Sequence, residues 1–284
     1  GDVMVENKSK KSKFTVGKLI LSILGVLAGF IFLSPFYIIV VNSFKTKKEM
    51  FTSVLALPKN FGYFDNYIKA SEGLDFAVSL RNSIIITLCS IVLIVVFSSM
   101  TAWMLQRTND KLSNIILFTF IASMLIPFQA VMLPLIRFMG KLNLLNMHGL
   151  IFMYLGFGTS LSVFLYHGFM KGIPKELDEA ATIDGCSKLQ TFWFIIFPLL
   201  KPITITVSIL NLIWIWNDYL LPSLTINKEG SQTIPLKVFF FFGEYTKQWH
   251  LALAGLTISI VPVIIFYFLM QKHIVKSVTA GSIK

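Results

Sequence analysis

Six long apolar segments dominate the chain, and each is long enough to cross a membrane as a helix. At 1.5 Å per residue, about 20 residues cross about 30 Å of hydrocarbon. The segments cover residues 19–44, 82–106, 112–136, 149–170, 203–226 and 251–271. They do not alternate between polar and apolar positions, as the strands of an outer-membrane barrel would. The pattern therefore predicts an all-α integral membrane protein with six transmembrane helices.

Composition and charge support this fold class. Of the 284 residues, 55% are hydrophobic and 14% are charged, with a mean hydropathy of +0.73. A soluble domain carries about 25% charged residues, so a single soluble domain is excluded, and intrinsic disorder is excluded as well. The net charge of +11 would suggest nucleic acid in a soluble protein. Here every charged residue except Asp218 lies outside the six segments, so we expect a lipid bilayer and no nucleic acid.

The segments divide the chain into an N-terminal tail (1–18), a six-helix transmembrane domain (19–271) and a C-terminal tail (272–284). An even number of spans places both termini on one side of the membrane. The first tail contains five Lys, which favours a cytoplasmic N-terminus. This orientation places the long loop 171–202 inside the cell and the loop 227–250 outside.

The inside loop predicts a helix–turn–helix between the fourth and fifth spans. Pro174 suits the first position of a helix, and the acidic residues that follow are favoured by the helix dipole. Gly185 can adopt the left-handed conformation that ends a helix. Ser187 and Gln190 then have the spacing of a capping box for a second helix.

Two interpretations of this loop remain open from the residues alone. It is either an amphipathic hairpin that merely joins two spans, or a docking element for another protein. Two small residues, Ala180 and Ala181, permit close approach of a partner, and the neighbouring acids offer it charges.

The loop resembles the EAA loop of bacterial ABC-importer permeases. The matching residues are Glu179, Ala180, Ala181, Gly185, Ile195 and Pro198, and Asp184 and Phe192 match the longer form seen in sugar permeases. Other matches lie at Asn66-Tyr67, Asn82-Ser83, residues 102–107, Pro127, Pro134, Trp216-Asn217-Asp218-Tyr219 and residues 279–284. Over residues 20–284 the chain is therefore similar to the maltose-type carbohydrate uptake family.

The resemblance implies a transport subunit in the cytoplasmic membrane of a bacterium, with both termini cytoplasmic. The residues implied to couple it to an ATPase are Glu179, Ala180, Ala181, Asp184 and Gly185, and in the tail Thr279, Gly281 and Lys284. The chain has no G-x-x-x-x-G-K-[ST] phosphate loop, so it is not expected to be an enzyme or to bind a cofactor. ATP and Mg²⁺ would bind to partner ATPases instead.

The implied partners are a second permease, which is a related but different chain, two ATP-binding subunits, a solute-binding protein and a carbohydrate, most simply an oligosaccharide. The outer loop 227–250 would face the solute-binding protein. Its Phe239–Phe242 run is equally compatible with an aromatic belt at the membrane interface.

Polar residues within the spans are candidates for the substrate path. Asn211, Trp214 and Asp218 are spaced i, i+3 and i+7, so they would share one helix face. Gln129, between two prolines, is a fourth candidate. The alternative is that these groups hydrogen-bond to neighbouring helices, which we favour for Asp218.

Three other functions are weighed against a sugar importer. One is a permease for another solute, such as an amino acid or phosphate. A secondary transporter or channel would predict acids or broken helices in two matched halves, which the sequence does not show. The third is a membrane scaffold. No metal site is expected, because His148 and His167 stand alone.

Overall fold

The computed structural model describes residues 16–244 and 248–280, and those residues form an all-helical structure. The helices are α1 (Val16–Ser43), α2 (Lys47–Thr52), α3 (Asp65–Gly73), α4 (Phe76–Thr108), α5 (Lys111–Ser123), α6 (Phe128–Lys141), α7 (Met147–Met170), α8 (Glu176–Ile183), α9 (Lys188–Thr191), α10 (Phe197–Leu199), α11 (Lys201–Asn217), α12 (Leu220–Thr225), α13 (Ile234–Glu244) and α14 (Trp249–Ala280). A short π-helix, Phe192–Ile196, joins α9 to α10. The all-α fold class is therefore confirmed.

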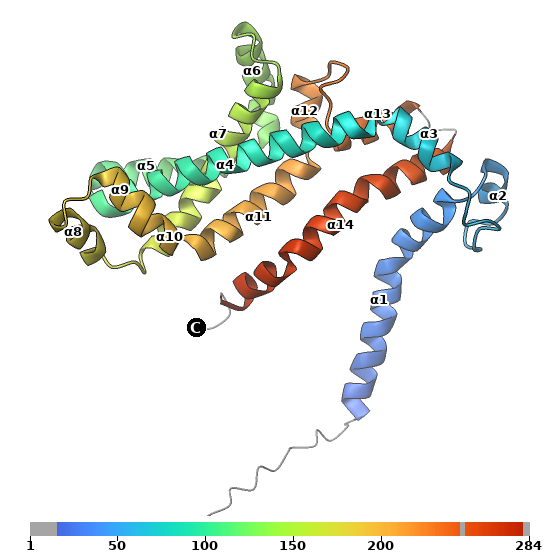
Figure 1. Cartoon of the computed structure of the whole chain (residues 1–284), viewed down its shortest axis with the longest axis horizontal. Helices are drawn as coiled ribbons and strands as arrows, with labels where there is room; N and C mark the ends of the chain where they lie inside the picture. The colour runs from blue at the N-terminus through green and yellow to red at the C-terminus, as the bar shows by residue number, and fades with distance from the viewer. Residues whose placement is uncertain (1–15, 245–247, 281–284) are drawn as a thin grey trace, which may run out of the picture.

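Four of the described helices are individually long and apolar enough to cross a membrane. They are α1, α4, α7 and α14. In Figure 1, α4, α7, α11 and α14 run along one another as a bundle, whereas α1 extends away from it. None of the apolar window of α1 is buried within the chain, as expected of a helix that faces lipid or another subunit.

The third predicted span, 112–136, is not one continuous helix. It is divided into α5 and α6, whose axes differ by 102° across a short break. The backbone leaves the helical conformation before Pro127, which is extended (φ −67°, ψ 141°) and caps α6. Because α5 has only 13 residues, it is about 20 Å long. Hydropathy alone missed this bend, since the sequence is apolar on both sides of it.

The fifth predicted span, 203–226, is also interrupted. Within it, α11 ends at Asn217 because Asp218 has an extended backbone (ψ 131°). A bend of 79° lies just before the predicted span, where the π-helix and α10 meet α11. The short helix α12 completes the segment. Over residues 16–244 and 248–280, four helices could each cross a membrane, or up to six segments if each bent pair counts as one span, and the count of six remains a prediction.

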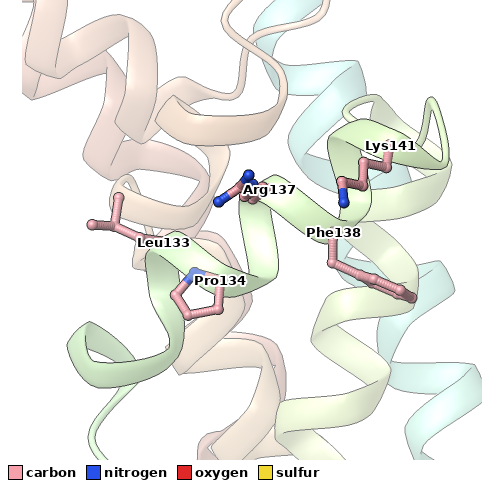
Figure 2. Close-up of a pocket in the computed structure, with 5 residues that line it drawn as sticks. All are labelled: Leu133, Pro134, Arg137, Phe138 and Lys141. Carbon is pink, nitrogen blue, oxygen red and sulfur yellow. The ribbon is translucent and has the colours of Figure 1, made fainter.

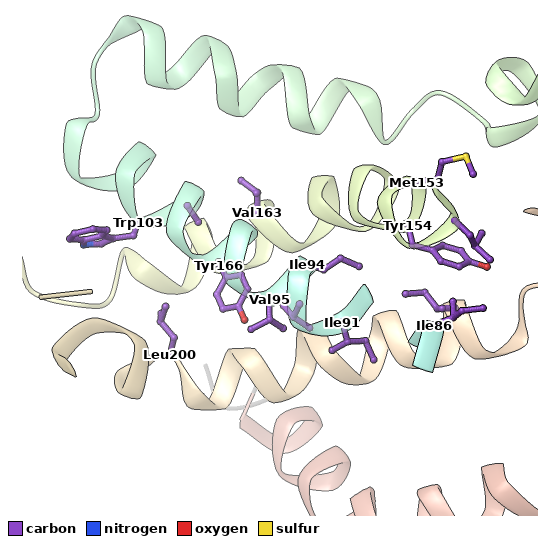
Figure 3. Packing of buried hydrophobic residues seen from close by; sticks show 14 of the residues in the cluster. Ile86, Ile91, Ile94, Val95, Trp103, Met153, Tyr154, Val163, Tyr166 and Leu200 are labelled. Atoms are coloured by element: carbon purple, nitrogen blue, oxygen red, sulfur yellow. The ribbon is translucent and has the colours of Figure 1, made fainter. Parts of the chain in front are cut away.

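The core lies mainly between α4, α7 and α11. Figure 3 shows Ile94 and Val95 from α4 packed near Val163 and Tyr166 from α7, with Tyr154 at one end of the cluster and Trp103 at the other. Small residues bring the helices close together. A Cβ at Gly158 in α7 would overlap the side chain of Ile94 and lie 2.7 Å from Asn211 Oδ1 in α11. Close packing of this kind stabilises membrane helices, because lipid supplies little hydrophobic driving force between them.

Candidate functional site

The predicted helix–turn–helix is present as α8 and α9, at one end of the bundle (Figure 1). The α8 helix ends in a Schellman motif, in which Gly185 N donates to Thr182 O (3.1 Å) and Cys186 N donates to Ala181 O (2.9 Å). Gly185 has φ +83°, as its position after Asp184 predicted. The capping box is also present, with Gln190 N donating to Ser187 Oγ (3.3 Å) and Ser187 N donating to Gln190 Oε1 (2.8 Å).

Pro174 lies outside α8, so the prediction that it occupies the first position of this helix is wrong. The helix begins at Glu176, and Lys175 O accepts its first hydrogen bonds, from Asp178 N and Glu179 N. The carbonyls of Ile173 and Pro174 accept instead from the Arg107 guanidinium, at 3.2 and 3.4 Å. A contact from α4 therefore keeps this segment outside the helix.

Four of the five predicted coupling residues are exposed on the hairpin. They are Glu179, Ala180, Asp184 and Gly185. Ala181 is only 2% exposed, so it packs inside the subunit and does not present a surface to a partner. Sequence reasoning missed Ile183, which is 86% exposed. Its spacing from Glu179 and Ala180, i+4 and i+3, was a usable signal, because residues at these spacings share a helix face.

The hairpin is attached to the end of α4 by a cluster of contacts that the sequence did not reveal. Trp103 Nε1 donates to Asp178 Oδ1 (2.8 Å), and Arg107 Nη2 pairs with Asp178 Oδ2 (2.8 Å). Trp103 also packs against Phe192 in the π-helix that follows α9, with ring centroids 5.4 Å apart. We call Trp103, Arg107 and Asp178 the inner clamp.

The residues predicted to line a substrate path mostly join α7 to α11. Asn211 is 5% exposed, and its Nδ2 donates to Ser162 Oγ (3.1 Å) and Val207 O (2.9 Å). Asp218 lies just beyond α11, where it accepts from Tyr154 Oη (2.9 Å). Trp214 packs edge-on against Tyr154 and is 40% exposed. Asn211 and Asp218 thus make contacts between helices.

Gln129 is exposed on the first turn of α6. An open pocket of about 530 Å³ lies further along the same helix. Figure 2 shows its lining residues, Leu133, Pro134, Arg137, Phe138 and Lys141. All five come from α6, so this pocket is one wall of a site that would need a second surface.

The tail and the outer loop are described only in part. Thr279 lies near the end of α14, but its side chain lies outside the described residues, as do Gly281 and Lys284. In the outer loop, α13 covers Ile234–Glu244, and Phe239 stacks on Tyr219 with centroids 4.8 Å apart. Among the residues that the structure describes, no group of three or more His, Cys, Asp or Glu could hold a metal ion.

Comparison with known proteins identifies the family. Residues 94–280 match the family described as the binding-protein-dependent transport system inner membrane component. The chain belongs to this family of permeases. It is therefore a transport subunit and not an enzyme, and it is a multi-pass protein of the cytoplasmic membrane. The secondary-transporter and scaffold alternatives are excluded, although two of the predicted spans are broken.

Individual relatives of this permease cover almost its whole length. It is 56% identical over 272 residues to the "Probable starch degradation products transport system permease protein AmyC" of Thermoanaerobacterium thermosulfurigenes, covering 96% of this chain and 99% of that protein. It is 36% identical to the "Multiple sugar-binding transport system permease protein MsmG" of Streptococcus mutans, covering 92% and 95%. A crystal structure of a bacterial ABC transporter involved in import of the acidic polysaccharide alginate contains a chain that aligns with a TM-score of 0.75 and 25% identity, covering 91% of this chain and 98% of that one.

Proposed function

We propose that this permease belongs to an ABC importer for an oligosaccharide. The observation that carries the proposal is the 56% identity, over nearly the full length of both chains, to a permease named for starch degradation products. Other relatives are named for melibiose, raffinose and stachyose in Bacillus subtilis and for arabinooligosaccharides in Halalkalibacterium halodurans. These names favour a carbohydrate over an amino acid or phosphate.

The complex we propose contains this chain, a second and different permease, two ATPases that bind ATP and Mg²⁺, and an extracytoplasmic solute-binding protein. The hairpin α8–α9 faces the cytoplasm in this arrangement, as do both termini. The outer loop 227–250 then faces the solute-binding protein. The Lys-rich first tail supports this orientation.

In the coupling step, the exposed face of α8 docks into the ATPase. Glu179 supplies a charge, Ala180 permits close approach, and Ile183 supplies an apolar side chain that is 86% exposed. Asp184 and Gly185 form the turn that orients α9 relative to α8. Because a ligand can shift a conformational equilibrium only through its different affinities for the two states, ATP-driven closure of the ATPases moves the hairpin and opens the bundle outward.

The substrate path lies where this chain meets the second permease. Trp214 and Gln129 are exposed and can line it, whereas Asn211 and Asp218 hold α7 against the end of α11. The wall formed by α6 is open on the other side, as a path between two subunits requires.

An uptake experiment tests the function. Cells that lack this chain should lose uptake of radiolabelled oligosaccharides from starch hydrolysis, while uptake of amino acids and phosphate stays normal. The reverse pattern would replace the oligosaccharide proposal with the rival solute.

The coupling role is tested by reversing one exposed charge. Glu179→Lys should abolish co-purification of the ATPase and sugar uptake. The matched control, Glu72→Lys, makes the same change at an exposed position of α3, which lies at the other end of the bundle (Figure 1). Normal uptake in the Glu179→Lys variant would refute the docking assignment.

A further inference from the structure

The helix α4 is built as a stiff rod. Its 33 residues make it about 50 Å long. Its sequence contains neither Pro nor Gly, whereas each of the other three long helices contains at least one, such as Pro35 in α1, Gly158 in α7 and Pro262 in α14. Sharp kinks almost always occur at such residues, so α4 has the fewest places at which to bend.

One end of α4 holds the coupling hairpin through the inner clamp. Trp103 and Arg107 lie one turn apart and share a helix face, and both reach Asp178 in the first turn of α8. The side chains of Arg107 and Asp178 are only 15% and 19% exposed, so water screens this pair less than a surface pair. The two bonds from Arg107 to the carbonyls of Ile173 and Pro174 fix the entry to α8 as well.

The other end of α4 holds the outer loop. Asn82 Nδ2 donates to Gly230 O (3.0 Å) and Gln232 O (3.2 Å). Ser83 Oγ accepts from Ile234 N (2.9 Å), which is the first residue of α13 and would otherwise be an unsatisfied helix donor. Asn82 and Ser83 are buried, at 1% and 2% exposure. We call these two residues the outer clamp.

We propose that α4 transmits movement between the coupling hairpin and the outer loop, and that the two clamps are its positioning residues. The clamps are 25 residues apart, from Asn82 to Arg107, or about 37 Å along the helix. Figure 1 shows α4 running from α13 to the hairpin α8–α9. This inference rests on the proposed function, since it requires a solute-binding protein outside and an ATPase inside. In such a transporter, the arrival of the loaded solute-binding protein at the outer loop raises ATP hydrolysis through α4.

The test uses the complete transporter in proteoliposomes. ATP hydrolysis is measured with and without solute-binding protein that has been loaded with oligosaccharides from starch hydrolysis, and the ratio of the two rates is the stimulation. Arg107→Met breaks the inner clamp and Asn82→Ala breaks the outer clamp. Each should lower the stimulation about fivefold or more, the range of ordinary coupling between sites. Arg107→Lys, which keeps a cation for Asp178, should restore part of it.

The double variant distinguishes one connection from two. If both clamps act through α4, Arg107→Met with Asn82→Ala lowers the stimulation no further than the more damaging single change, because the connection is already broken. The inference would be overturned if the losses of the two single variants multiplied in the double variant, or if either single variant kept wild-type stimulation. If the wild-type transporter showed no stimulation at all, this inference would be overturned, whereas the proposed function is tested separately by the uptake experiment.

A change in the middle of α4 tests its stiffness directly. Val92 is 60% exposed and lies between the clamps. Val92→Pro removes a helical hydrogen bond and kinks the helix, so the stimulation should fall although both clamps remain intact. Val92→Ala is the matched control and should behave as the wild type.

If Arg107→Met prevents assembly, Trp103→Phe provides a milder variant of the inner clamp, because it removes the Nε1 donor and keeps a ring against Phe192. Wild-type stimulation in both Val92→Pro and Trp103→Phe would contradict the inference.

Discussion

The buried hydroxyl of Tyr154 in α7 donates a hydrogen bond of 2.9 Å to Asp218 Oδ2, at the point where α11 ends. Tyr154 has no exposed surface, and the second oxygen of Asp218 accepts from Leu220 N at 3.0 Å. One carboxylate therefore joins α7 to the end of α11 and accepts a hydrogen bond from the first residue of α12. This satisfies a charged group that would otherwise be costly within a membrane.

Replacing Asp218 should destabilise the protein before it affects sugar selectivity. Asp218→Ala leaves the Tyr154 hydroxyl without its acceptor, at a cost of about 1–3 kcal/mol. Asp218→Asn keeps an acceptor oxygen and should cost less. Thermal unfolding in detergent measures the order wild type, Asn, Ala. An Asp218→Asn variant of normal stability that no longer transports sugar would instead assign Asp218 to the substrate path.

Gly158 should tolerate no side chain. A Cβ there would overlap Ile94 Cδ1 and lie 2.7 Å from Asn211 Oδ1, so Gly158→Ala should force α4 and α11 away from α7. Overpacking of this kind typically costs about 1–3 kcal/mol. The expected result is a lower unfolding temperature and a lower yield of assembled complex.

Gly156, two residues earlier in the same helix, is the matched control for this change. A Cβ there meets nothing within 4 Å, and Ala is favoured over Gly within a helix by about 1 kcal/mol. Gly156→Ala should therefore equal or exceed the wild type in stability. Equal stability of the two Ala variants would show that α7 does not approach its neighbours closely at Gly158.

Local features were predictable from the sequence, whereas contacts between distant segments were not. The left-handed Gly185 and the Ser187 capping box each depend on residues within one or two turns, so their spacing was sufficient. Asp178 was interpreted only as a charge near a helix dipole, because its partner Trp103 is 75 residues away. A membrane segment also hides its bends, since Pro127 lies within apolar sequence on both sides.

Substitutions of Gly185 should be limited by its backbone conformation and not by a lack of space for a side chain. Its φ is +83°, yet a Cβ there would meet nothing within 4 Å. The cost of Gly185→Val is therefore backbone strain alone, about 1–2 kcal/mol. Gly185→Asn should be milder, because Asn tolerates the left-handed region. ATPase co-purification and sugar uptake should fall in the order wild type, Asn, Val, and equal loss in both variants would point to a contact with Gly185 itself.

Lys45, between α1 and α2, should make the free energy of unfolding change with pH in the alkaline range. Its side chain has no exposed surface, and Nζ donates to Ser53 O (2.7 Å), Asn42 Oδ1 (3.1 Å) and Val54 O (3.3 Å). Burial lowers the pKa of Lys45 below its usual value of 10.5, and the negative charge of Glu49 opposes this only in part.

The sign of the pH effect follows from this lowered pKa. Below the folded pKa of Lys45 both states carry the proton, and the cost of burying the charge is fully present. As pH rises from the folded pKa toward 10.5, the unfolded state binds more protons than the folded state, so stability increases. Lys45→Met removes this gain, so the unfolding temperature of the wild type minus that of the variant should increase from neutral to alkaline pH. Lys48→Met, at an exposed position of α2, is the control and should follow the wild-type profile. If the wild-type value minus the variant value stays constant or decreases, the ammonium of Lys45 is not penalised by burial.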